Sequence, residues 1–261
     1  MTPLSEVMRN GVMGDGTFQV DVGEDWMQGR SVFGGLQAAI AVRAMRTRVP
    51  AGVPLRTLQF TFIEPIGPGR VNASATLLRT GKNATHVEAR LGAPGAAQAI
   101  AIGVFGTSRE SIVRRDIPPS APAPVQAKLP YMPGILPSFL QHFDVNLLAG
   151  AAPFSGAPVD RVVYDVSLHD RGPTSESHLL VFGDFVPPVA LSWMPRPVPG
   201  ASLTWMLELL DADFTSQPLD HWRIDASLDA ARDGYTSQTT TIHAPNGIAI
   251  ALTRQSMLVF A

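Results

Sequence analysis

An internal duplication limits what this chain can fold into more than any other feature of its sequence. Residues 72–81 and 225–234 carry Ala, Ser, Arg and Gly at the same four offsets. Each stretch is followed by a strand-like run, a turn containing proline and glycine, and a second strand-like run. In the second copy, Asn246–Gly247 is a strong hairpin signal, because both central turn positions tolerate a positive φ. This shared order over about fifty residues predicts two copies of one supersecondary unit.

A helix and a further strand precede the repeated stretch in each half. Residues 58–62 alternate apolar and polar side chains, the period of a half-buried strand, and residues 203–210 hold the equivalent place. Residues 34–46 form one apolar helical face and end before two prolines, which predicts a helix. A second helix is expected over residues 183–194 with Asp184 at its start, since proline is tolerated in a first helical turn. Each half is therefore predicted to be α+β, with one helix covering one face of an antiparallel sheet.

A proline-rich stretch separates the two halves. Nine prolines lie between Pro118 and Pro158, together with several apolar side chains, which indicates an ordered but irregular connection. We therefore expect an N-terminal repeat over residues 1–110, a connection over 111–160 and a C-terminal repeat over 161–261.

The composition excludes several classes of function. With 22 acidic and 20 basic residues, the chain lacks the broad positive field that holds nucleic acid. Without cysteine there is no thiolate nucleophile, disulfide or zinc–thiolate site, and a reducing, cytoplasmic location is expected. No apolar run approaches the roughly 18 residues of a spanning helix. The sequence also lacks a nucleophile elbow, a phosphate loop and histidines spaced for a metal, so neither a metal nor a cofactor is expected.

Several segments together resemble the acyl-CoA thioesterase II family, whose fold is a double hot-dog. The segments that carry the resemblance are Trp26 with residues 32–39, then 60–69, 78–82, 184–191 and 253–255. The resemblance covers nearly the whole chain except the connection. It implies two helix-plus-sheet repeats that form one continuous antiparallel sheet. It also implies hydrolysis of acyl-CoA thioesters in fatty acid metabolism. The low fraction of charged residues favours further association, into a dimer of double hot-dogs.

The resemblance also implies a catalytic set that binds and activates one water. Carried onto this sequence, the set is Asp184, the hydroxyl of Thr204 and Gln255. Ser202 is the alternative hydroxyl, expected on the same strand face as Thr204. The residue types suit the task, because a carboxylate can take a proton from water while a hydroxyl and an amide orient it.

Substrate binding is expected at the start of the first helix. Backbone N–H groups at a helix N-terminus can hold a developing oxyanion, and glycine lets a substrate approach the backbone. The residues are Phe33, Gly34 and Gly35, with Ser202 on the other side. Two alternatives stay open: a non-catalytic acyl-CoA or lipid-binding protein, and a hot-dog hydratase, against which the absence of an Asp-x₄-His spacing counts.

Overall fold

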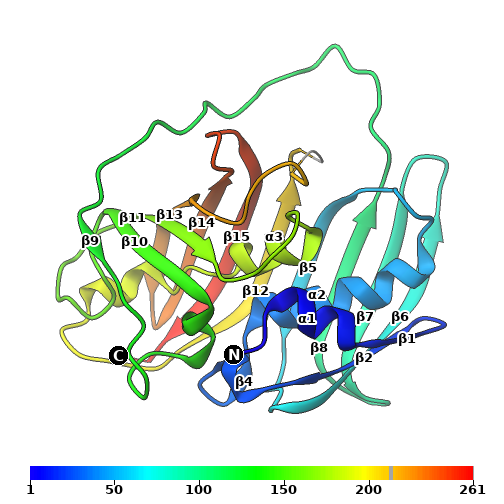
Figure 1. Ribbon diagram of the computed structural model, residues 1–261, viewed down its shortest axis with the longest axis horizontal. Coiled ribbons are helices and arrows are strands. Elements are labelled where there is room, and N and C mark those ends of the chain that lie inside the picture. Colours follow the sequence, from blue (N-terminus) through cyan, green and yellow to red (C-terminus); the bar gives the residue numbers. More distant parts are fainter. Residues whose placement is uncertain (212–213, 261) are drawn as a thin grey trace.

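A single curved sheet forms the body of the molecule in the computed structural model, which describes residues 1–211 and 214–260 (Figure 1). Thirteen antiparallel strands follow the order β1-β2-β6-β7-β8-β5-β12-β15-β14-β13-β11-β10-β9. The two repeats meet where β5 (Leu55–Phe62) pairs with β12 (Gly200–Leu209). The predicted α+β fold, with two helix-plus-sheet repeats in one continuous sheet, is confirmed.

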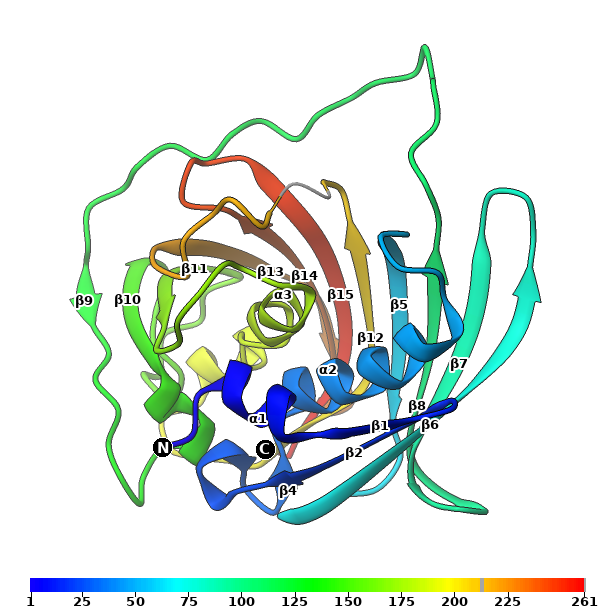
Figure 2. The same ribbon diagram turned by 45° about the vertical axis from the view of Figure 1, so that its right-hand side comes forward.

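The first repeat packs its sheet around one buried helix. Its elements are α1 (Leu4–Asn10), β1 (Val12–Gly14), β2 (Thr17–Val22), β3 (Met27–Gln28), β4 (Ser31–Val32), α2 (Gly34–Met45), β5, β6 (Gly69–Thr80), β7 (Thr85–Ala93) and β8 (Ala96–Phe105). Alternate residues of β7 are buried, as the period of two requires for a strand with one face on a core. All but one of the twelve residues of α2 are buried, because the sheet curls around the helix (Figure 2).

The second repeat has the same plan. Its elements are β9 (Ala127–Lys128), β10 (Phe143–Ala149), β11 (Arg161–Leu168), α3 (Glu176–Gly183), β12, β13 (Trp222–Arg232), β14 (Tyr235–His243) and β15 (Ala249–Val259). Helices α2 and α3 lie side by side and run in opposite directions inside the curved sheet (Figure 2). The N-terminal end of α2 therefore meets the C-terminal end of α3.

The second helix was predicted in the wrong place. The expected helix began at Asp184, whereas α3 ends at Gly183 and Asp184 is its C-terminal cap. The real start is a reciprocal cap, in which the backbone N–H of Ser175 donates to Nδ1 of His178 (2.9 Å). Beyond Asp184, Pro187 and Pro188 admit only a short 3₁₀ turn over Val189–Trp193.

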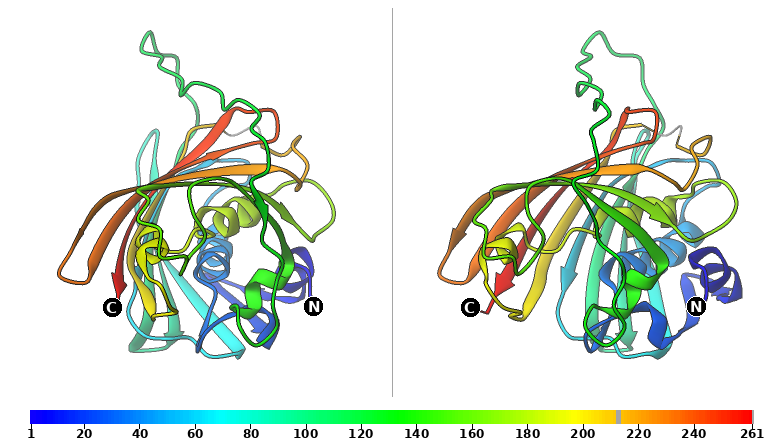
Figure 3. Two further views of the ribbon diagram at one scale, coloured as in Figure 1. Left: turned by 90° about the vertical axis from the view of Figure 1, so that its left-hand side faces the viewer. Right: turned by 60° about the vertical axis from the view of Figure 1, so that its left-hand side comes forward.

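The connection is only partly irregular. Residues 106–126 run as an extended, largely exposed strap across the molecule (Figures 1 and 3). The later part of the stretch contains β9, a 3₁₀ turn over Ser138–His142 and β10, which pairs with β11. The expectation that residues 143–149 are irregular is therefore wrong. None of the helices in residues 1–211 and 214–260 is long and apolar enough to cross a membrane.

Candidate active site

Asp184 lies at the junction of the two central helices. It follows the last turn of α3, is only 7% exposed, and accepts a hydrogen bond from the backbone N–H of Gly35 in the first turn of α2. A Cβ on Gly34 would overlap Oδ2 of Asp184 and come within 2.8 Å of the Phe62 ring. Glycine is therefore required at position 34 by the close approach of this carboxyl group.

Gln255 joins Asp184 to a hydroxyl group. It stands in β15 with its side chain buried, and Nε2 donates to Oδ1 of Asp184 and to Oγ of Ser202, both at 2.8 Å. Both N–H bonds of the amide are thus used, which fixes its orientation. The Ser202 hydroxyl accepts this bond and keeps its own hydrogen for another acceptor.

The structure brings Ser202 to the site and leaves Thr204 outside it. The register between β12 and β15 shifts between Ser202 and Thr204, so Leu203 is an extra, bulged residue. Ser202 then pairs with Met257 and Thr204 with Ser256, which point to opposite faces of the sheet. The expectation that Ser202 and Thr204 share a face is wrong, and Thr204 is exposed.

Burial raises the pKa of Asp184 to about 7. The hydrogen bonds from Gln255 and Gly35 oppose this shift, since both stabilise the carboxylate. A carboxyl group with a pKa near neutrality is suited to accept a proton at physiological pH.

Two residues of the expected substrate site have other partners in the structure. Phe33 is fully buried and stacks on Phe139, with ring centroids 4.0 Å apart, so it belongs to the core. The N–H of Gly35 bonds to Asp184, so it supports this carboxyl group and is not free for a substrate oxygen.

Gln238 is a residue of this region that the sequence did not single out. It is the cross-strand partner of Gln255, is 1% exposed, and its Oε1 accepts a hydrogen bond from the N–H of Val189 (2.9 Å). It thereby ties β14 to the segment that follows Asp184. The signal in the sequence is an amide at an inward position of an alternating strand, between Thr236 and Thr240.

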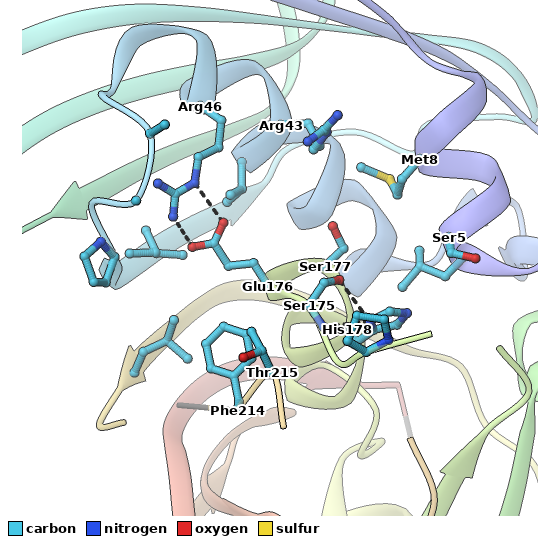
Figure 4. Close-up of a pocket in the computed structure, with 18 of the residues that line it drawn as sticks. Ser5, Met8, Arg43, Arg46, Ser175, Glu176, Ser177, His178, Phe214 and Thr215 are labelled. Carbon is cyan, nitrogen blue, oxygen red and sulfur yellow. Dashed lines mark hydrogen bonds and ion pairs between the residues drawn. The ribbon is translucent and has the colours of Figure 1, made fainter. Parts of the chain in front are cut away.

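Two pockets of the molecule lie away from the site. Neither the groove drawn in Figure 4 nor the smaller pocket beside Ser120, Asp165 and Asn246 borders Asp184, Ser202 or Gln255. Among the described residues there is also no cluster of three or more His, Asp or Glu side chains that could hold a metal ion.

Comparisons with known proteins give the chain a family. The family model described as the acyl-CoA thioesterase N-terminal domain matches residues 22–106, and that of the acyl-CoA thioesterase C-terminal domain matches residues 115–259. No curated protein matches the chain.

Solved structures share the fold over the whole chain. A conserved protein of unknown function with a hot dog fold from Alicyclobacillus acidocaldarius has a TM-score of 0.87 at 21% identity, covering 100% of this chain and 99% of that one. The tesB protein of Mycobacterium avium subs paratuberculosis has a TM-score of 0.79 at 16% identity, covering 100% of both chains. The acyl-CoA thioesterase II TesB2 from Mycobacterium marinum has a TM-score of 0.74 at 15% identity, covering 98% and 97%.

Proposed function

The chain belongs to the acyl-CoA thioesterase family, and on this premise we propose that it hydrolyses acyl-CoA thioesters with a water activated by Asp184. The observation that carries the proposal is the trio of buried Asp184, buried Gln255 and half-buried Ser202, linked by two 2.8 Å hydrogen bonds. All three side chains belong to the second repeat, so one chain would hold one catalytic site.

The trio has the donors and acceptors that an attacking water needs. Asp184 accepts a proton from the water, and the free hydrogen of the Ser202 hydroxyl donates to the water oxygen. Gln255 keeps both groups in place through its two N–H bonds. Such positioning lowers the entropic part of the barrier without a covalent acyl-enzyme.

The reaction balances on these groups. The water oxygen forms a bond to the thioester carbon, and its proton passes to Asp184. The carbon–sulfur bond then breaks, and the proton held by Asp184 passes to the departing thiolate of CoA. The products are CoA thiol and a carboxylic acid, which keeps the second proton of the water and releases it to solvent to become the carboxylate.

The carbonyl oxygen needs a donor while it carries negative charge. Because the N–H of Gly35 serves Asp184, the N–H of Gly34 is the first-turn donor of α2 that we assign to the carbonyl oxygen. The Phe62 ring lies against Gly34, and it must turn aside to admit the thioester.

Thiol release from acyl-CoA of increasing chain length tests the proposal. Asp184→Asn is expected to lower kcat about 10²–10⁴-fold, the usual contribution of a general base. In the wild type, the rate should fall as the pH drops below about 7, because Asp184 becomes protonated. Ser202→Ala should lower kcat, whereas Thr204→Ala, the matched control on the exposed face, should leave it unchanged.

Two results would contradict the proposal. Absence of thiol release on every chain length would refute the activity. A full rate in Asp184→Asn would refute the mechanism while leaving the activity in place.

A non-catalytic acyl-CoA-binding protein is the second candidate. The burial of Asp184 and Gln255 favours it, because these side chains are 7% and 4% exposed and already bond to one another. Saturable binding of acyl-CoA without any thiol release would support this reading.

The setting of the reaction is also a proposal. We infer that the protein acts in the cytoplasm in fatty acid metabolism, as a dimer of two such chains. The absence of cysteine and the low charged fraction of 16% support this inference. Light scattering on the purified chain tests the dimer, since a mass of one chain would exclude it.

A further inference from the structure

The duplication builds a second site at the opposite end of the helix pair. Strands β5 and β12 carry a bulge at the same place, between Leu55 and Thr57 in one and between Ser202 and Thr204 in the other. When the pairing of β5 with β8 is aligned with that of β12 with β15, Leu55 takes the position of Ser202. In the same way, Gly103 of β8 is the counterpart of Gln255 in β15.

The helices complete the correspondence. Arg46 is the C-terminal cap of α2, as Asp184 is the C-terminal cap of α3. The second site therefore has Arg46 at the position that Asp184 takes in the candidate active site. It has Leu55 at the position of Ser202. Position 103 carries no side chain, and the thioether of Met45 takes the space, 2.7 Å from where a Cβ would lie. The second site has no general base of the first kind.

This second site is a groove with a cavity volume of about 1140 Å³. It lies between α1, the end of α2 and the beginning of α3, and both Arg46 and Leu55 line it (Figure 4). Its volume is ample for a ligand of drug-like size, which typically occupies about 300–1,000 Å³.

The groove is positively charged on a chain whose net charge is −2. Five arginines and two carboxylates line it: Arg9, Arg43, Arg46, Arg56 and Arg171 against Glu176 and Asp211.

Two of these arginines already have partners. Arg46 is neutralised by a two-pronged ion pair with Glu176, with Nε and Oε2 2.9 Å apart, which bridges the two repeats (Figure 4). Arg56 donates to the backbone oxygen of Gly106 and to Ser108.

Arg43 differs from the other arginines of the groove in having a buried polar atom without a partner. It makes no ion pair with a described residue, and its guanidinium lies 5.7 Å from the centre of the Phe18 ring. Its Nε is buried without a hydrogen-bond partner, an arrangement that costs stability unless an anion offsets it.

Apolar side chains surround this cation. The apolar lining includes Leu4 and Met8 of α1, Val42 of α2, and Leu55 and Phe214. The groove thus places the Arg43 guanidinium beside apolar side chains, with Arg9 and Arg171 as further cations of its lining. This chemistry is complementary to a long-chain carboxylate, whose charge needs a guanidinium and whose chain needs a dry surface.

We propose that this groove binds a free long-chain fatty carboxylate, with its head group on Arg43 and its chain along the wall formed by α1. The ligand is the product of the reaction proposed above, and in that respect the inference rests on the proposed function. The second site would then hold product while Asp184 carries out hydrolysis at the other end of the helix pair.

Calorimetric titration of the full chain with dodecanoate tests the proposal without using activity. The wild type should bind dodecanoate saturably, and Arg43→Gln should weaken this binding at least tenfold. Arg232→Gln, an exposed arginine outside the groove, is the matched control and should change nothing. 1-Dodecanol, with the same chain and no charge, should bind wild type and Arg43→Gln equally weakly.

The outcomes separate this proposal from the catalytic one. Asp184→Asn should bind dodecanoate as tightly as the wild type. Absence of thiol release from the wild type, with dodecanoate binding intact, would refute the activity and leave the groove standing. Dodecanoate binding that Arg43→Gln does not weaken, or no binding at all, would overturn the groove. Dodecanoyl-CoA can be titrated into Asp184→Asn as a further ligand. If it binds through Arg43 while dodecanoate does not bind, the fatty-carboxylate proposal is overturned and the groove takes a nucleotide-bearing ligand.

Discussion

At the scale of single residues, Asp184 shows a conflict between chemistry and stability. Its carboxyl group is buried between α2 and α3, and burial raises its pKa to about 7. A group of this kind binds a proton more tightly in the folded chain than in the unfolded one. Its contribution to stability is therefore complete below the ordinary pKa of 3.8 and is lost as the pH rises towards and beyond 7.

Replacing Asp184 with Asn should remove this pH dependence. The amide is close to the carboxyl group in shape and never becomes a buried charge. Relative to the wild type, the free energy of unfolding of Asp184→Asn should therefore rise by up to ~1.4 kcal/mol per pH unit between about pH 4 and 7. Urea unfolding at several pH values measures it.

The matched control for this experiment is Asp233→Asn. Asp233 is exposed and has a φ of 54°, a conformation that asparagine also tolerates. Urea unfolding of Asp233→Asn at the same pH values gives the reference for an Asp-to-Asn exchange at an exposed position. If the difference in unfolding free energy between Asp184→Asn and the wild type does not change with pH, the raised pKa of Asp184 is contradicted.

At the scale of elements, the contact between the two helices depends on a glycine. A Cβ on Gly35 would lie 2.8 Å from Cα of Val181 and 2.9 Å from the carbonyl oxygen of Leu180. Both atoms belong to the backbone of α3, so no side chain can move to make room. The helices approach this closely only because one of them has no side chain at the crossing point.

Gly35→Ala is expected to push α2 and α3 apart. Overpacking of this kind costs about 1–3 kcal/mol of unfolding free energy. It should also lower thiol release, because Asp184 loses its bond to the N–H of residue 35. Gly67→Ala, where a Cβ meets nothing within 4 Å, is the control and should remain within about 0.5 kcal/mol of the wild type. Equal stability of the two variants would contradict the close contact.

At the scale of the whole molecule, the two repeats are one folding unit joined in two ways. Hydrogen bonds between β5 and β12 make a single sheet, and α2 packs on α3 beneath it. The strap over residues 106–126 joins the repeats covalently but lies on the surface, where Ile112 is fully exposed and Val113 is 82% exposed.

Cutting the strap should therefore leave the molecule assembled. Trypsin is expected to cleave first at the exposed Arg114 and Arg115. The two fragments should still elute together at the size of the intact chain, because the sheet and the helix pair hold them. An Arg109, Arg114 and Arg115 triple glutamine variant should resist this cut. Fragments that separate without denaturant would show that the strap holds the repeats together.

Local patterns in the sequence determined the architecture of each repeat. The duplicated residues, the alternation along 58–62 and the Asn246–Gly247 turn depend on neighbours close in the chain, so the strands could be predicted. The helix α3 could not, because its core run Leu179–Phe182 is continuously apolar and lacks the helical period. Asp184 was thus placed at a helix start when it stands at a helix end.

Within the site, the sequence predicted the residue types and the tertiary structure decided their arrangement. Asp184 and Gln255 were singled out by their resemblance to family positions, and the fold brings them within 2.8 Å across 71 residues of chain. The choice between Ser202 and Thr204 depends on a single bulged residue, Leu203, which turns one hydroxyl inward and the other outward. A bulge arises from pairing with β15, some fifty residues further along the chain. No local pattern around residue 203 contains that partner, so only the assembled sheet could decide which hydroxyl meets Gln255.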